Sequence, residues 1–292
     1  MPFLFGSWLA LLMIDGKGEL EKFIMDDQGR FVTLRKASRI WAIGAVHGNA
    51  GDLCALHDQI ANKLCAGDKL VYLGNYIGYG QEILPTLQEI LRFRRWFLSI
   101  PPLTTLQDIV YLRGRQEEMW QKLRQLQFAP NPVEILDWVK SRGVAQTLEA
   151  FGLSVDEGIK NAEEGTLALT YWTTKLKDAG RSVAGHDQFF SSLKHAAFNE
   201  GGSILMVSSG LDVTKSLSRQ VDSLWWSGKS FEFIDGPYGG FKCLVRGYDP
   251  LHQGYKSTDG MHSLDAGNPE NGKPIAVCLS GDGQIEDLII TQ

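Results

Sequence analysis

Three short glycine-containing segments decide the fold: residues 43–49 read IGAVHGN, residues 73–80 read LGNYIGYG, and residues 112–117 read LRGRQE. Each follows an apolar run, at 40–44, 69–74 and 109–114, with the length and composition of a buried strand that ends in glycine. The stretches between these runs, 53–64 and 83–98, carry the apolar spacing of helices. Strand and helix therefore alternate, which predicts an α/β core whose loops gather at the strand ends.

The rest of the chain divides into a helical part and a second strand-rich part. Helical patterns cover 118–126, 132–141, 145–151, 164–179 and 187–198, and together they predict a helical insert over about 117–200 at the rim of the loops. Strand patterns return from residue 203, with turn signals at 235–237, 239–240 and 281–283. A second sheet is therefore predicted to close a two-sheet sandwich.

The amino-terminal residues 1–37 precede the predicted domain, which spans 38–292. Residues 26–29 read DDQG between two short apolar runs, 23–25 and 31–34, which indicates a small hairpin. Pro2 to Ile14 is mostly apolar, but it is shorter than the roughly 20 residues that span a bilayer and lacks the features of a secretory signal. We expect it to pack on its own domain or, alternatively, to contact a partner or a membrane surface.

Composition narrows the class of protein. With 292 residues, 43% of them hydrophobic, the chain is long enough for one sizeable core and is expected to be globular. A net charge of −5 gives no basic field for nucleic acid, so no nucleic-acid partner is expected. The cysteines Cys54, Cys65, Cys243 and Cys278 are far apart and lack zinc-site spacing. They are interpreted as reduced core residues of a cytoplasmic protein.

The three opening segments resemble the GDxHG, GDxxDRG and GNHE signatures of the calcineurin-like metallophosphoesterases, most closely the phosphoprotein (serine/threonine) phosphatase branch. Three later segments resemble further signatures in the same order. Residues 204–212 with 224–226 resemble HAGxDP…LW, residues 243–250 resemble VVHGHTP, and residues 263–267 match LDTG. The resemblance covers roughly 38–290. It implies a metallophosphoesterase-like two-sheet β-sandwich flanked by helices.

At most metal-ligand positions that the resemblance implies, this chain carries a different side chain. Ala45 replaces an Asp ligand with a methyl group, and Asn75 replaces the bridging Asp with a neutral amide, which is a poor bridge between two dications. Arg115 replaces an Asn ligand with a protonated guanidinium that has no lone pair to offer. Ser208 and Tyr248 stand at His ligands. Of six expected ligand positions, only His47 keeps its residue, so no metal is expected.

The catalytic positions are replaced in the same way. Gly78 and Tyr79 stand where the family has the Asp and Arg that orient the catalytic His and bind the substrate phosphate. Gln116 replaces the His that protonates the leaving group, and an amide does not titrate near neutral pH. No catalytic residue is therefore expected.

Three hypotheses about function follow. The first is a pseudophosphatase, a catalytically inactive binding or scaffold protein whose protein partner the sequence does not name. The second is a metal-dependent phosphoesterase that binds Mn or Fe/Zn through a rearranged set drawn from His47, Asn75, Asp212, Asp249 and His252. The third is a phosphate-ester or nucleotide sensor that binds an anion through Arg113, Arg115, Tyr79 and Tyr248.

Overall fold

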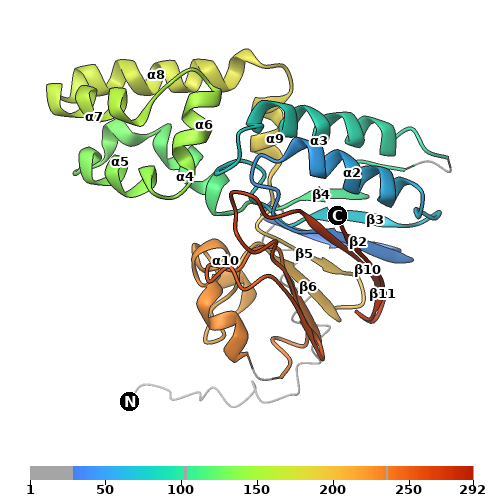
Figure 1. The fold of residues 1–292 in the computed structure, drawn as a ribbon. Coiled ribbons are helices and arrows are strands. Elements are labelled where there is room, and N and C mark those ends of the chain that lie inside the picture. Colours follow the sequence, from blue (N-terminus) through green and yellow to red (C-terminus); the bar gives the residue numbers. More distant parts are fainter. Residues whose placement is uncertain (1–28, 102–103, 235, 292) are drawn as a thin grey trace, which may run out of the picture.

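A computed structural model describes residues 29–101, 104–234 and 236–291 of the chain. Two β-sheets lie face to face, and helices and loops cover their outer faces (Figure 1). In order across the five-stranded sheet, the strands are β11 (Ile285–Ile290), β10 (Ile275–Ser280), β2 (Arg39–Ile43), β3 (Lys69–Tyr72) and β4 (Ile109–Tyr111). In order across the six-stranded sheet, they are β1 (Phe31–Leu34), β5 (Ala196–Asn199), β6 (Ile204–Val207), β7 (Cys243–Arg246), β9 (Met261–Leu264) and β8 (Tyr255–Thr258). The predicted α/β two-sheet sandwich is confirmed.

The helices lie in three places (Figure 1). Those beside the five-stranded sheet are α2 (Ala50–Ala61) and α3 (Ile83–Phe97). The helices of the insert, which follow β4 and precede β5 in the sequence, are α4 (Arg115–Leu123), α5 (Pro132–Lys140), α6 (Val144–Ala150), α7 (Val155–Glu164), α8 (Thr166–Ser182) and α9 (His186–Ser192), with the 3-10 turn η1 (Leu126–Phe128). Those beside the six-stranded sheet are the short η2 (Leu217–Arg219), α10 (Ser223–Trp226) and η3 (Gly228–Phe233).

Alternation along the strands divides the core into layers. In β2, Ile40 and Ala42 pack between the two sheets, whereas Trp41 and Ile43 pack against the helices. The side chains of β3 and β4 alternate in the same way. A third cluster fills the outer side of the six-stranded sheet beneath α10. Because both faces of these strands are buried, their sequences read as continuous apolar runs.

Parallel pairing brings the strand ends together. β2 pairs with β3, and β3 with β4, in parallel, so the three loops that follow them leave the same edge of the sheet. In the other sheet, β6 pairs with β7 and β7 with β9 in parallel. The loop after β2 ends at Asn49, whose side chain accepts from the Asp52 amide at 3.1 Å and so caps α2.

The helical patterns placed several boundaries wrongly. The predicted helix over 187–198 ends at Ser192, and residues 196–199 form β5 instead, because they pair with strands on both sides. The predicted helix over 164–179 corresponds to α8, whereas α7 before it was not predicted; the two helices meet at Gly165 with φ of 114°. That backbone conformation ends an α-helix and favours glycine.

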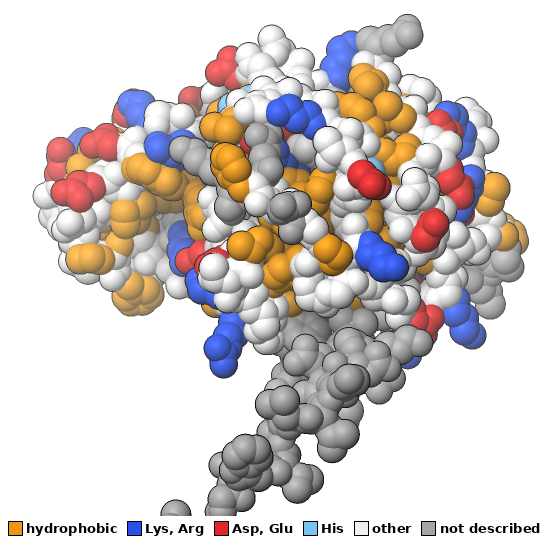
Figure 2. Space-filling view, turned by 90° about the horizontal axis from the view of Figure 1, so that it is seen from below, with side chains coloured by type: hydrophobic (Ala, Val, Ile, Leu, Met, Phe, Trp, Pro, Cys, Tyr) orange, Lys and Arg blue, Asp and Glu red, His pale blue; other side chains and the backbone are white. Residues whose placement is uncertain are grey.

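The cysteine interpretation was partly wrong, because Cys65 is exposed and Cys54 only half-buried, while Cys243 and Cys278 are buried. Pro2 to Ile14 and the first hairpin run, 23–25, lie outside the described residues. The second run forms β1, which pairs in parallel with β5. None of the described helices is both long and apolar enough to cross a membrane. On the face seen in Figure 2, hydrophobic side chains lie in several groups, with charged side chains of both signs between them.

Candidate functional site

Backbone hydrogen bonds join the loops that the sequence singled out. The amide of Ala45 donates to the Gly247 carbonyl at 3.0 Å, and that of His47 donates to the Asn75 carbonyl at 2.8 Å. The Tyr248 amide donates to the Ser208 carbonyl at 3.0 Å. Segments from both sheets therefore meet at one place. We call the side chains gathered there the strand-end cluster: His47, Asn75, Tyr79, Arg115, Gln116, Ser208, Trp226, Tyr248 and His252.

Glycine lets two of these loops touch. A Cβ added at Gly114 would lie 2.4 Å from the Asn75 amide nitrogen, and one added at Gly74 would lie 2.7 Å from the Gly114 nitrogen. Neither distance leaves room for a side chain, and both obstacles are backbone atoms that cannot swing away. These glycines therefore allow the close approach of the second loop, residues 73–80 after β3, and the third loop, residues 112–117 after β4.

The Glu117 side chain fixes the backbone of the second loop by hydrogen bonds. Its carboxylate is 2% exposed and accepts from the backbone amides of Asn75 and Tyr76, both at 2.8 Å, and of Gly114 at 2.9 Å. The Ile77 amide donates as well, at 3.3 Å. Burial raises the pKa of Glu117, and the backbone donors oppose that rise. Glu117 was not among the site residues expected from the sequence. Its place three residues after the N-cap, Gly114, was the signal for this contact.

Asn75 is fixed by its neighbours, so its amide oxygen is already engaged. Its Oδ1 accepts from the Gln116 amide at 3.1 Å, and its Nδ2 donates to the Ser208 Oγ at 3.5 Å. Asn75 also adopts a left-handed backbone conformation with φ of 58°. Of the five non-glycine residues with positive φ in the described chain, four lie in the cluster: His47, Asn75, Tyr79 and His252. Such strained conformations concentrate at functional sites of folded proteins.

His47 lies between two aromatic rings. Its imidazole meets Tyr79 at a ring distance of 5.2 Å and Tyr248 at 5.4 Å, both edge to face, and only 5% of the residue is exposed. Neither ring nitrogen makes a hydrogen bond of good geometry with a described residue, although the Ile77 carbonyl lies near the ring. Burial lowers the pKa of His47 to about 3; the Ile77 carbonyl opposes this shift, and the charges of His252 and Arg115 add to it. The imidazole is therefore neutral at neutral pH.

Arg115 rests on two aromatic faces. Its guanidinium carbon lies 5.0 Å from the centroid of Trp226 and 5.3 Å from that of Tyr248, distances at which cation–π attraction acts. Arg115 forms no ion pair with any described residue, although Glu117 lies two positions further along the same helix. Burial raises the pKa of Tyr248 and the Arg115 charge opposes it, so the phenol stays protonated. A fixed cation thus occupies one of the strand ends.

The helical insert packs directly on the cluster. The Gln116 side chain, 2% exposed, donates from Nε2 to the Arg142 carbonyl at 2.7 Å. The Tyr79 amide donates to the Gly143 carbonyl at 3.0 Å, and the Gly78 amide donates to the Thr147 hydroxyl at 3.0 Å. Residues at the start of α6 and just before it therefore form hydrogen bonds with the backbone of the second loop.

Arg113, proposed from sequence as an anion ligand, has an acidic partner instead. Its Nη1 donates to the Glu118 Oε2 at 3.1 Å, and its backbone amide donates to the Lys194 carbonyl. Arg113 is half-buried, and its side chain pairs with Glu118 and not with Arg115, Tyr79 or Tyr248. The structure brings three of the four proposed anion ligands together.

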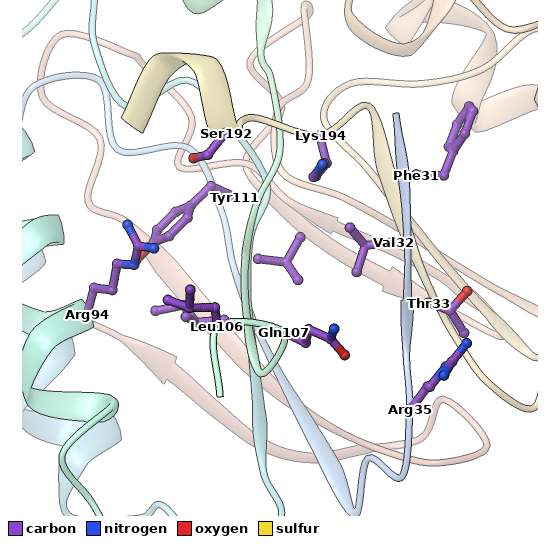
Figure 3. Close-up of a pocket in the computed structure, with 12 residues that line it drawn as sticks. Phe31, Val32, Thr33, Arg35, Arg94, Leu106, Gln107, Tyr111, Ser192 and Lys194 are labelled. Carbon is purple, nitrogen blue, oxygen red and sulfur yellow. The ribbon is translucent and has the colours of Figure 1, made fainter. Parts of the chain in front are cut away.

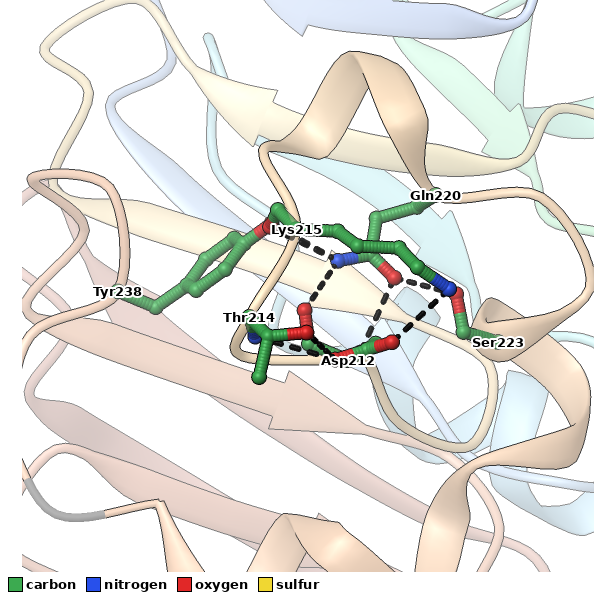
Figure 4. Close-up of polar contacts among 6 residues, drawn as sticks. All are labelled: Asp212, Thr214, Lys215, Gln220, Ser223 and Tyr238. Atoms are coloured by element: carbon green, nitrogen blue, oxygen red, sulfur yellow. Dashed lines mark hydrogen bonds and ion pairs between the residues drawn. The ribbon is translucent and has the colours of Figure 1, made fainter.

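The two aspartates of the rearranged metal set are engaged elsewhere. The Asp212 carboxylate accepts from the Thr214 hydroxyl at 2.6 Å and pairs with Lys215 at 2.9 Å (Figure 4). Gln220 closes the same turn by bonding the Asp212 backbone in both directions. Asp249 pairs with Arg246 at 3.0 Å, with both side chains 1% exposed. Among the described residues, no group of three or more His, Cys, Asp or Glu side chains is placed to hold a metal.

Comparison with known proteins gives a fold and no closer relationship. No family model matches the sequence, and no curated protein matches it. Among solved structures, one described as a "putative diadenosine tetraphosphatase" aligns over 90% of this chain and 99% of its own, with a TM-score of 0.55 and 15% identity. A serine/threonine phosphatase from Saccharomyces cerevisiae, similar to human PP5, aligns over 94% of this chain and 86% of its own, with a TM-score of 0.48 and 12% identity. The chain has the fold of the calcineurin-like metallophosphoesterases.

Proposed function

We propose that this chain is a pseudophosphatase: a metallophosphoesterase-like protein without hydrolase activity that acts by binding a partner. The observation that carries the proposal is the position of Arg115, whose cation lies on Trp226 and Tyr248 at the strand ends where the resemblance expects metal ions. A divalent metal at that place would be repelled by the guanidinium.

The donor chemistry supports the same conclusion. Binuclear hydrolysis needs carboxylate and imidazole ligands that hold two metal ions and activate a water. Here Asn75 already uses its amide oxygen to accept from Gln116, and Asp212 and Asp249 are ion-paired to basic side chains. His47 and His252 have ring nitrogens without a hydrogen-bond partner among the described residues, but no third His, Cys, Asp or Glu is grouped with them to hold a metal. Two imidazoles alone do not hold a binuclear catalytic centre.

A more specific version of this binding role is that the protein senses an anion. Arg115 has no acidic partner among the described residues and lies over Tyr248, and the protonated phenols Tyr79 and Tyr248 both contact His47. A phosphate ester bound there would pair with the guanidinium and accept from the hydroxyl groups. This site differs from a metal centre because all its positive charge comes from a side chain.

Hydrolysis of p-nitrophenyl phosphate with added manganese, together with metal analysis of the purified chain, tests the proposal. We expect no turnover above the background and far less than one equivalent of manganese, iron or zinc. The alternative enzyme, with a rearranged Mn or Fe/Zn site, would show turnover that disappears in His47→Asn at unchanged stability. That result would overturn the proposal.

A further inference from the structure

A cavity lies on the side of the sandwich where the outermost described strands of the two sheets run. β1 ends the six-stranded order, and β4 ends the five-stranded order. The cavity between them has a volume of about 610 Å³ (Figure 3). β1 contributes Val32, the loop before β4 contributes Leu106, and β4 contributes Ile109. None of its lining residues belongs to the strand-end cluster, so it is a separate site.

The charge lining this cavity has one sign. Arg35, Arg94 and Lys194 border it, and no described lining residue is acidic, although the whole chain has a net charge of −5. Arg35 and Arg94 form no ion pair with any described residue. The Lys194 ammonium donates to the Gly29 carbonyl at 2.7 Å, which leaves its charge uncompensated. An acidic ligand would complement this local field.

The backbone of β4 offers a second recognition feature. The Asp108 carbonyl accepts from Leu70, and the Leu112 amide donates to Tyr72, so these two residues direct their backbone toward β3. Successive residues of a strand point opposite ways, and the backbone groups of Ile109 and Tyr111 therefore face outward. The Tyr111 carbonyl indeed accepts from the Lys194 amide on that outer side, at 2.8 Å.

Ile109 continues the same outer edge; it is only 4% exposed and is reached through the cavity that it lines. Its outward amide and carbonyl have no hydrogen-bond partner among the described residues. An unpaired strand edge of this kind accepts an extended chain, whose alternate side chains enter the adjoining pocket. Val32, Leu106 and Ile109 supply apolar walls for such side chains.

We propose that this cavity binds an acidic, extended peptide segment of a partner protein. The segment pairs with the outer edge of β4 at Ile109, places apolar side chains against Val32 and Leu106, and sets its carboxylates beside the basic residues of the cavity. The proposal does not depend on whether the strand-end cluster hydrolyses phosphate esters.

Binding of a fluorescein-labelled eight-residue peptide of alternating Val and Glu to the full chain, followed by anisotropy, tests this. We expect saturable binding that weakens about tenfold in Arg94→Glu, as loss of one close charge pair implies. Arg95→Glu is the matched control, because Arg95 is the next residue on α3, is exposed, and does not line the cavity. It should leave the affinity within about twofold.

Two further peptides test the mode of binding. A version with Lys in place of Glu, and one with alternate backbone amides methylated, should both lose binding, because the first reverses the charge and the second cannot pair with a strand edge. Equal weakening by the two arginine variants, or undiminished binding of the methylated peptide, would overturn the proposal. Absence of binding to the full chain would also overturn the proposal. In that case the occupant of the cavity would be the chain's own residues 1–28 or a second copy of the chain, and sedimentation would detect the second copy.

Discussion

The Glu117 carboxylate accepts the backbone amide of Asn75 at 2.8 Å across 42 positions of sequence. Because the same carboxylate also binds the amides of Tyr76, Ile77 and Gly114, it fixes the path of the second loop against the third. The geometry at the strand ends therefore depends on a carboxylate that is bound to four backbone amides.

Replacing Glu117 with Gln should destabilise the fold. The amide keeps the shape but puts an NH₂ group among four backbone donors, so at least one buried donor loses its acceptor. We expect the free energy of unfolding to fall by about 2–4 kcal/mol, measured by urea denaturation. Glu149→Gln, exposed on α6, makes the same chemical change and should cost less than about 0.5 kcal/mol. Equal effects of the two variants would show that the Glu117 contacts contribute little.

Gly114→Ala should be poorly tolerated because a methyl group would lie 2.4 Å from the Asn75 amide nitrogen. Separating the two loops would cost about 1–3 kcal/mol, as overpacking in a rigid site does. Gly51→Ala in α2 is the matched control, since the nearest atom lies 4.0 Å from its added Cβ and the helix favours alanine. Thermal melts should show a lower Tm for the first variant and an equal or higher Tm for the second.

Much of the fold could be predicted from the sequence because its signals are local. Apolar runs that end in glycine gave β2, β3 and β4, and helical spacing gave α2 and α3 close to their observed bounds. The interpretation of 187–198 as one helix was wrong because Ala196 to Asn199 are held as a strand between β6, which follows after a short turn, and β1, which lies far away in sequence. The sequence identified the residues that form the site, but not the groups that each of them contacts. Asp212 and Lys215 are only three residues apart, so their pairing is a local contact, but nothing local indicates that Trp226 packs against Arg115.

His47 should make stability depend on pH in a defined direction. Its pKa is about 3 in the folded chain and near 6.5 when unfolded, so between these values the unfolded state binds the extra proton. The stabilisation is full above pH 6.5 and is lost as the pH falls toward 3. One such proton corresponds to about 1.4 kcal/mol per pH unit.

Urea denaturation of the wild type and of His47→Asn at pH 7, 6 and 5 isolates this term from His195, whose pKa burial also lowers, to about 4. Asn tolerates the left-handed backbone found at position 47, where φ is 51°. Between pH 6 and 5 the wild type should lose about 1 kcal/mol more stability than the variant. Parallel curves would mean that the imidazole titrates normally in the folded protein.

Arg115 should be the residue on which any oxyanion binding depends. If the guanidinium receives the anion, sulfate soaked into crystals should lie beside it, and Arg115→Gln should weaken inorganic phosphate binding by about tenfold or more in calorimetry, because a charge-assisted contact is lost. Arg113→Gln is the matched control: Arg113 pairs with Glu118 at 3.1 Å, so its loss should lower stability slightly while leaving phosphate affinity unchanged. Equal loss in both variants would point to a general field effect. No phosphate binding in the wild type would remove the sensor hypothesis and leave the stacked Arg115 as a structural replacement for the metals.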